Sequence, residues 1–466
     1  MYSLGIPRKK SIDALQKHID LYFKEINKLR STQNSRVPIS GLPAELLSEV
    51  FLYLVESGLK DDRLGFTWGT FRFRLVCTRW NEVAIGFPHL WVWWAPGAFN
   101  AWGLFNARSK NAPISLTWLP CWRIEPPFGN GIFEDPTIPG RIRTLDCSGT
   151  NDQLEYILGG FGSSHSSDAS SVRLHITPYD EQGPRKSTTT FLSLSFPKLS
   201  KLDINNSLPD VSSPIFTTSN LVSLKLGIPY TDERRYTQSQ FSKILQRHQN
   251  LQELHLWEGG MPQVEPSEPP APVVLPQLVD LRLCGTEAMI SGFMDLLSMS
   301  SPLHSVIIDF RSATTMTVSA LTNVVKKILP SYYEQQGLDY PRTADHLTIS
   351  DSRKKSLVFD AGSRSTSVSH PASNLKLQFS GVDKSLVGEI WLLFPLDRVL
   401  EFTAIGLRLA RVKYREILEK MEGLLHLRLN KMDPGPVMGA LGFGDQIEGV
   451  HKVAAETMLD YLHTDS

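Results

Sequence analysis

The sequence predicts an α+β protein in which a small helical unit precedes a longer array of strands and helices. Apolar residues at steps of three and four indicate helices before about residue 92, and apolar-x-x-Leu-x-apolar segments recur from about residue 141 onward. Hydrophobic residues make up 41% of the 466 residues and charged residues 21%, so we expect a large core and no wholesale disorder.

Composition excludes several classes of protein. Lys plus Arg and Asp plus Glu both number 48, whereas a dedicated nucleic-acid-binding protein usually carries a basic excess. The four cysteines form no C-x-x-C pair, so we expect reduced thiols and a cytoplasmic or nuclear location. No apolar run reaches the roughly 18 residues that a membrane span needs. We therefore expect neither a nucleic acid nor a membrane as partner.

Residues 1–36 are predicted to form an N-terminal amphipathic helix, with Ser11 as a plausible N-cap. Apolar side chains recur at steps of three and four and form one stripe: Ile12, Leu15, Ile19, Tyr22, Ile26 and Leu29. The stripe is shorter than three heptads, which leaves two interpretations open. The helix either docks on the rest of the chain or frays, or it associates with another helix.

Residues 37–92 are predicted to form a small helical unit. Pro43 suits the first turn of a helix, and the apolar stripe of this helix continues to Leu54; a second helix is centred on Trp80. A unit of about 55 residues is near the lower limit for a stable core, yet this one carries more large apolar side chains than it can hide. The surplus is expected to face a partner or, alternatively, the rest of the chain.

Three motifs in this unit together resemble an F-box. They are Leu42-Pro43-x-Glu45-Leu46-Leu47 followed by Val50, Phe51 and Leu54; Val76-Cys77-x-x-Trp80; and Leu90-Trp91. The resemblance implies docking on the Skp-family adaptor of a cullin-based ubiquitin ligase. The residues to which it assigns this contact are Leu42, Pro43, Glu45, Leu46, Leu47, Val50, Phe51, Leu54, Val76, Cys77, Trp80, Leu90 and Trp91.

Residues 93–140 are predicted to connect the two parts and to contain the first strands. Six of the ten Trp residues lie between Trp91 and Trp122, which is not typical of a flexible linker. Alternating hydropathy in residues 89–93 and 114–118 indicates two strands.

Residues 141–466 are predicted to form a substrate-recognition domain that resembles an irregular leucine-rich-repeat solenoid. The clearest segments centre on Leu202, Leu224, Leu254 and Leu281, at steps of 22, 30 and 27 residues, close to the 20–29-residue period of such repeats. A longer step is interpreted as an inserted loop over residues 330–344, and residues 450–462 as a closing helix. The predicted fold class is thus α+β, a small helical F-box followed by an irregular α/β leucine-rich-repeat solenoid. A generic α/β domain with a mixed sheet is the structural alternative.

The sequence contains no recognisable catalytic, metal-binding or cofactor-binding motif. It lacks G-x-x-x-x-G-K-[ST], G-x-S-x-G and H-E-x-x-H, and its twelve His and four Cys residues show no metal-ligand spacing. We therefore expect no enzyme activity, cofactor or metal. An enzyme hidden in the repeat region is the rival hypothesis.

Protein binding fits the repeat region better. In residues 253–257 the two leucines belong to the predicted core, so alternation sends Glu253, His255 and Trp257 to the concave face of the predicted solenoid. Interface hot spots are enriched in Trp and Arg. The predicted substrate-binding residues are Glu253, His255, Trp257, Arg282 and Arg428. The alternative for Trp257 is that the loop of residues 261–276 folds back and covers it.

The sequence therefore predicts a substrate-recognition subunit of an SCF-type ubiquitin ligase. The F-box would bind the Skp-family adaptor and through it a cullin, and the repeats would bind a protein substrate of unknown identity. Such a subunit acts by raising the effective concentration of substrate near a ubiquitin-charged enzyme. A non-degradative F-box scaffold that makes the same adaptor contact is the alternative.

Overall fold

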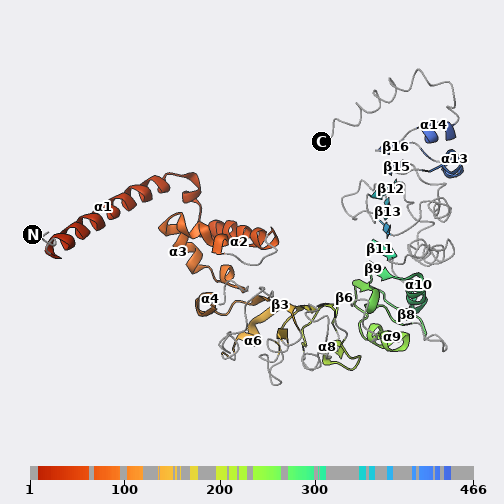
Figure 1. Cartoon of the computed structure of the whole chain (residues 1–466), viewed down its shortest axis with the longest axis horizontal. Coiled ribbons are helices and arrows are strands. Elements are labelled where there is room, and N and C mark those ends of the chain that lie inside the picture. Colours follow the sequence, from red (N-terminus) through yellow and green to blue (C-terminus); the bar gives the residue numbers. More distant parts are fainter. Residues whose placement is uncertain are drawn as a thin grey trace, which may run out of the picture. The chain divides into compact units, whose positions relative to one another are not determined.

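The structure is a computed structural model with two compact units, residues 1–171 and 172–466 (Figure 1). It describes residues 9–61, 68–94, 102–118, 135, 137–150, 153–154, 158, 168–176, 196–206, 209–217, 220–227, 235–263, 271–298, 303, 305–310, 346–352, 356–362, 375–380, 401–405, 409–422, 424, 426–430 and 435–441. The predicted loop at residues 330–344 and the predicted helix at residues 450–462 lie outside this part.

The first unit begins with helical segments, and those at residues 9–35, 44–61 and 78–86 lie where the apolar stripes predict helices. The segments are α1 (Lys9–Ser35), η1 (Pro38–Gly41), α2 (Ala44–Asp61), η2 (Trp68–Leu75), α3 (Thr78–Gly86), η3 (Pro88–Trp91) and α4 (Trp102–Ser109). Pro43 directly precedes α2, and its carbonyl accepts a hydrogen bond from the amide of Leu47 at 3.1 Å. Glu45 lies in the first turn, where a negative charge favours the helix dipole.

An aromatic core holds the helices of the first unit together. The rings of Phe51 and Phe73 stack at 4.3 Å, and those of Phe71 and Trp91 stack at 5.1 Å. Phe105 on α4 meets Trp91 edge-on at 5.2 Å. Rings from α2, η2, η3 and α4 therefore form one continuous cluster, which burial of large apolar side chains stabilises.

The first unit ends in short parallel strands. β1 (Trp93–Trp94), β2 (Ile114–Trp118) and β3 (Ile142–Gly149) pair in this order, and α6 (Thr137–Arg141) precedes β3. The strand predicted at residues 114–118 is confirmed. The strand predicted at residues 89–93 is wrong for residues 89–92, because η3 ends at Trp91 and β1 begins only at Trp93. Leu90, Trp91 and Val92 are all buried, so their pattern reflects the aromatic core and not a strand with one wet face.

The second unit contains a sheet with helices packed against its strands. Six strands follow one another in sequence order: β4 (Ser171–Ile176), β5 (Lys201–Asn205), β6 (Ser223–Gly227), β7 (Glu253–Trp257), β9 (Asp280–Gly285) and β11 (Ser305–Phe310). The connections include α8 (Pro214–Thr217), α9 (Gln238–Arg247), η6 (Glu258–Gly260), β8 (Val273–Val274), α10 (Glu287–Leu296) and β10 (Leu297–Ser298).

The remaining strands reverse the order of the sheet. β12 (His346–Ser352), β13 (Ser356–Gly362) and β14 (Leu375–Ser380) pair antiparallel, and β14, not β12, continues the sheet beside β11. β15 (Glu401–Ile405) then pairs with β12, and β16 (His426–Asn430) pairs with β15, both in parallel. The helices α13 (Arg411–Glu419) and α14 (Gly435–Ala440) belong to this part.

The prediction of a leucine-rich-repeat solenoid is wrong. The chain has an α/β fold with nine sequential, all-parallel strands, three in the first unit and six in the second. Each unit of a solenoid stacks on its sequence neighbour, but here the antiparallel strands separate β11 from β12. The sheet is Rossmann-like in being parallel, although its strand order runs one way from β4 to β11 and lacks the reversal that creates a nucleotide-binding crevice.

The recurring leucines mark buried strands, which explains why they resembled repeats. Leu202, Leu224, Leu254 and Leu281 lie in β5, β6, β7 and β9, at most 1% exposed. α9 and α10 contribute further apolar side chains to this core, and Gln238 of α9 donates a hydrogen bond to the carbonyl of Gly292 in α10 at 2.9 Å. Among the described helices, none is long and apolar enough to cross a membrane.

Candidate functional site

One face of α2 carries exposed apolar side chains. They are Leu46, Val50, Tyr53 and Leu54, which we call the α2 surface. Their spacing of four, three and one residues places them on adjacent turns of the same side of the helix. Leu75 and Val76, between η2 and α3, are also exposed. Arg79 of α3 donates a hydrogen bond to the carbonyl of Leu42 and ties the beginning of α3 to that of α2.

The opposite face of α2 fills the core of the first unit. Leu47, Phe51 and Val55 follow at steps of four and are fully buried. Phe51 contacts Phe73 and also lies 5.2 Å from the ring of Trp80. α2 thus buries one apolar face in the core of the first unit and exposes a second apolar face to solvent.

The predicted adaptor-binding residues divide into three groups by burial. Exposed are Pro43, Glu45, Leu46, Val50, Leu54 and Val76; half-buried are Leu42, Cys77 and Trp80; buried are Leu47, Phe51, Leu90 and Trp91. The exposed group can touch a partner directly, whereas the buried group acts through the core. The exposed Tyr53 and Leu75 were not among the predicted residues; the helical spacing from Leu46 and Val50 would have found Tyr53.

Trp91 positions the end of α3 from within the core. Its indole N–H donates to the carbonyl of Ala84 at 2.8 Å, and the guanidinium of Arg108 lies 4.4 Å from its ring centre. A second guanidinium, that of Arg74, lies 5.1 Å from the same ring. These contacts are intramolecular, so Trp91 supports the α2 surface and does not belong to it.

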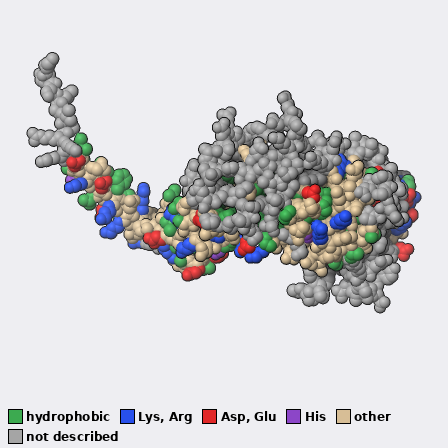
Figure 2. Space-filling model, turned by 90° about the horizontal axis from the view of Figure 1, so that it is seen from below, with side chains coloured by type: hydrophobic (Ala, Val, Ile, Leu, Met, Phe, Trp, Pro, Cys, Tyr) green, Lys and Arg blue, Asp and Glu red, His purple; other side chains and the backbone are tan. Residues whose placement is uncertain are grey.

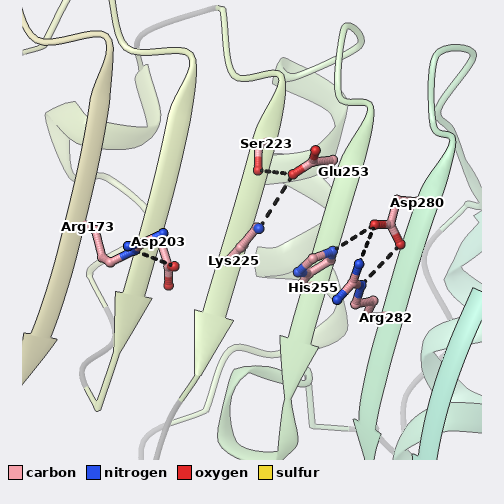
Figure 3. Close-up of polar contacts among 8 residues, drawn as sticks. All are labelled: Arg173, Asp203, Ser223, Lys225, Glu253, His255, Asp280 and Arg282. Carbon is pink, nitrogen blue, oxygen red and sulfur yellow. Dashed lines mark hydrogen bonds and ion pairs between the residues drawn. The ribbon is translucent and has the colours of Figure 1, made fainter. Parts of the chain in front are cut away.

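A second polar surface lies on the strands of the second unit. Eight side chains from β4, β5, β6, β7 and β9 form what we call the polar ladder: Arg173, Asp203, Ser223, Lys225, Glu253, His255, Asp280 and Arg282 (Figure 3). The strand register aligns Lys225 with His255 and His255 with Arg282. These positions alternate with the buried leucines and lie on the other face of the sheet.

Charges of opposite sign alternate along the polar ladder. Arg173 contacts Asp203 at 3.2 Å, and Lys225 lies 3.6 Å from Glu253. The hydroxyl of Ser223 also donates to Glu253, at 2.8 Å. The ladder stops at β11, where the apolar Ile307 aligns with Arg282.

Asp280 joins His255 and Arg282 at the end of the ladder. His255 Nε2 lies 3.3 Å from Asp280 Oδ2, and the guanidinium of Arg282 reaches both carboxylate oxygens, at 3.3 and 3.0 Å. Burial would raise the pKa of Asp280, but the hydrogen bonds and charges of these neighbours lower it to about 2. The carboxylate is therefore ionised at neutral pH, which suits ion pairing and not general acid catalysis.

Glu253 is held in its charged form in the same way. Burial acts to raise its pKa, but the hydrogen bond from Ser223 and the charges of Lys225 and His255 lower it overall. Within the described residues, no group of three or more His, Cys, Asp or Glu side chains could hold a metal ion.

Trp257 lies along the sheet beside the ladder. Its ring meets that of His255 at right angles, 6.0 Å away, and a Cβ added at Gly227 would come within 3.3 Å of its Cε3 atom. Because Gly227 has no side chain, the indole of Trp257 can lie close to its backbone. Trp257 is half-buried, and residues 264–270 of the loop that would cover it in the alternative interpretation lie outside the described part.

The structure brings four of the predicted substrate-binding residues together. Glu253, His255, Trp257 and Arg282 share one face of β7 and β9, but His255 is only 4% exposed and serves as an internal link. Arg428 lies on β16, and five strands separate β16 from β9 in the sheet order. Sequence reasoning missed Ser223 and Asp280, which strand alternation from Lys225 and Arg282 would have identified.

Comparisons with known proteins do not assign the chain to a family. A scan against protein-family models gave no match, and a search of curated proteins gave no relative. The F-box resemblance therefore depends on the three motifs, and the two surfaces have to be interpreted from their own chemistry.

Proposed function

We propose that the chain is a substrate-recognition subunit of a cullin-based ubiquitin ligase. In this proposal the α2 surface binds the Skp-family adaptor, which connects the chain to a cullin. The polar ladder, with Trp257 beside it, binds a protein substrate and replaces the predicted repeats in this role. The chain supplies binding and geometry and leaves bond formation to the ubiquitin-charged enzyme.

The observation that carries the proposal is the second apolar face of α2. Leu46, Val50 and Leu54 are exposed although α2 already buries Leu47 and Phe51 in the core. Burying a side chain of this size stabilises by roughly 1.5–3 kcal/mol, which an isolated chain would forgo at each position. Contiguous exposed apolar side chains on one helix face are typical of a protein-binding site. The same residues belong to the motif that resembles an F-box.

The polar ladder supports recognition of a protein surface of mixed charge. Its cations Arg173 and Arg282 are the more exposed members of their ion pairs, while the partner carboxylates are more buried. A substrate would therefore meet guanidinium groups first, beside a half-buried indole. Arg and Trp are the side chains that interface hot spots favour.

The adaptor contact can be tested with exposed residues alone. Replacing Leu46 and Val50 with Asp should abolish co-purification of the Skp-family adaptor without unfolding the chain, because neither side chain belongs to the core. Val412→Asp on α13 is the matched control, since Val412 is an exposed apolar residue of the second unit. Retention of the adaptor by a folded Leu46→Asp/Val50→Asp variant would refute the proposal.

The substrate contact needs a separate experiment. Proximity labelling with the Trp257→Ala/Arg282→Ala variant should lose specific labelled proteins while the adaptor is retained. Arg415→Ala, at an exposed position of α13, is the control. Unchanged labelling would exclude the ladder as the substrate site. Measured turnover and ubiquitination of the lost proteins would separate a degradative receptor from a non-degradative scaffold.

A further inference from the structure

The helix α1 presents an apolar stripe that nothing in the described part of the chain covers. The side chains of the stripe are between 44% and 70% exposed: Ile12, Leu15, Ile19, Tyr22, Ile26 and Leu29. Figure 2 shows hydrophobic side chains exposed along this helix, beside Lys and Arg side chains. Of the α1 side chains from residue 12 to residue 34, Asn34 is the first that is half-buried, and it donates to the carbonyl of Val76 at 3.1 Å.

The stripe follows a heptad pattern without interruption. With Ile12 at position a, the a positions are Ile12, Ile19 and Ile26, and the d positions are Leu15, Tyr22 and Leu29. In parallel coiled coils, Ile at a combined with Leu at d favours two strands, and Tyr22 is the one d position here that is not Leu. We propose that α1 binds α1 of a second copy of this chain in a parallel, in-register, two-stranded coiled coil.

The charges beside the stripe favour the parallel arrangement. Glu25 occupies a g position and Arg30 the following e position, and in a parallel in-register pair these two meet across the interface in both directions. In an antiparallel pair centred on the same stripe, g positions face g positions and e positions face e positions, so Glu25 would meet His18, and Arg30 would meet Lys9, which carries the same charge. Charge complementarity therefore favours parallel over antiparallel pairing of α1 with α1 of a second copy.

The opposite side of α1 suits solvent. The f positions, farthest from the stripe, include Lys17 and Lys24. These positive charges stay apart from the apolar seam and remain hydrated in the pair. The seam spans about 26 Å, since 17 steps separate Ile12 from Leu29 at roughly 1.5 Å each. A seam this short is expected to dissociate on dilution.

Sedimentation equilibrium of the full chain tests association directly. The wild-type chain should show a mass that rises from monomer towards dimer with concentration. Ile19→Asp/Ile26→Asp should remain monomeric, whereas Lys17→Asp/Lys24→Asp at f positions should still dimerise. A wild-type chain that is monomeric at every concentration would overturn the proposal, as would binding of α1 to anionic vesicles without self-association.

Charge exchange tests the ion pair. Glu25→Arg or Arg30→Glu alone replaces two attractive pairs with repulsive ones, so the dissociation constant should rise about five- to tenfold. The Glu25→Arg/Arg30→Glu double variant should return near to the wild-type value, and equal weakening by all three would contradict the pairing.

A single cysteine tests the orientation. Leu29→Cys should form a disulfide-linked dimer on mild oxidation, because in-register d positions face each other in a parallel pair. In an antiparallel pair the two cysteines would lie roughly 26 Å apart and could not bond. Lys24→Cys at an f position controls for the native cysteines. Cross-linking of both variants alike, or of neither, would refute the parallel arrangement. This result is independent of the adaptor experiment.

Discussion

On α2, the exposed side chains of Leu46, Val50 and Leu54 are apolar, whereas on β4 to β9 the side chains of Arg173, Lys225 and Arg282 each lie beside a carboxylate. The driving force for binding a partner therefore differs between the two surfaces. Burial of the α2 surface would remove apolar area from water. The polar ladder already satisfies its own charges and offers a substrate mainly geometry and hydrogen bonds.

This difference separates affinity from specificity. Apolar burial is non-directional and scales with area, so the α2 surface can bind firmly to one complementary groove. Paired charges contribute less to affinity than to orientation, because a partner must compete with the bonds they already make. Under the proposed function, the α2 surface would serve stable docking and the polar ladder would serve discrimination among substrates.

The largest expected effect distinguishes the two faces of α2. Phe51→Ala should lower the free energy of unfolding of the first unit by about 3–5 kcal/mol, because it removes a buried ring that stacks on Phe73. Leu46→Ala should change it by less than about 0.5 kcal/mol. Chemical denaturation monitored by Trp fluorescence measures both. Equal losses would mean that Leu46 is also a core residue.

The next effect concerns the core beneath the second unit's sheet. Burial, aided by the charge of Arg247, lowers the pKa of His248 at the end of α9 to about 4. The stability that depends on neutral His248 is complete above pH 6.5 and is lost as the pH falls towards 4, because the unfolded chain takes up the proton first. We expect a loss of about 2–3 kcal/mol in this range.

A matched pair of variants assigns this pH dependence. His248→Leu should flatten the fall in unfolding free energy between pH 6.5 and 4, whereas His89→Asn, at an exposed position, should leave it unchanged. Denaturation curves at half-unit pH steps provide the measurement. An unaltered slope in His248→Leu would exclude this residue as the cause.

A smaller effect is expected within the polar ladder. Asp280→Ala should cost about 1–2 kcal/mol, since it leaves the buried His255 without its carboxylate partner. Asp280→Asn should cost less, because an amide oxygen can still accept a hydrogen bond. Because the pKa of Asp280 is about 2, its charge stabilises the fold fully above about pH 4. This stabilisation is lost as the pH falls to 2. Thermal unfolding at pH 7 and pH 2 provides the measurement. Unfolding temperatures of both variants equal to that of the wild type at both pH values would contradict the prediction.

The smallest effect is expected at the exposed end of the ladder. Arg173→Ala breaks the contact with Asp203, yet the guanidinium is more than half exposed, so the unfolding free energy should change by no more than about 0.5 kcal/mol. Substrate capture should nevertheless weaken if the exposed guanidinium groups orient the partner. If Arg173→Ala lost as much stability as Asp280→Ala, the two ends of the ladder would not differ in their contribution to stability.

Sequence periodicity predicted elements better than it predicted architecture. The stripe from Leu46 to Leu54 identified α2, and the segments around Leu224 and Leu254 identified β6 and β7, because local burial leaves a local period. The solenoid failed because the same leucine pattern appears in any parallel strand covered by helices. Which strand continues the sheet after β11 is a long-range choice, and the sequence around β12 and β14 carries no local signal of it.

The candidate sites were predictable to different degrees. Motif residues such as Pro43 and Leu46 could be named, but the division between exposed Val50 and buried Phe51 depends on how η2 and α3 pack. On β7, alternation placed Glu253 and Trp257 correctly on one face. It did not reveal that His255 is buried between neighbouring strands, because Asp280 reaches it from a strand 25 residues away.

The central claim is that the α2 surface is a docking site for the Skp-family adaptor, and titration calorimetry with purified proteins tests it most directly. The account predicts saturable one-to-one binding with a negative heat-capacity change, as burial of apolar surface requires. Leu46→Asp/Val50→Asp should abolish this binding, and Val412→Asp should leave it intact. Absence of binding by the folded wild-type chain, or equal binding by the Leu46→Asp/Val50→Asp variant, would contradict the claim.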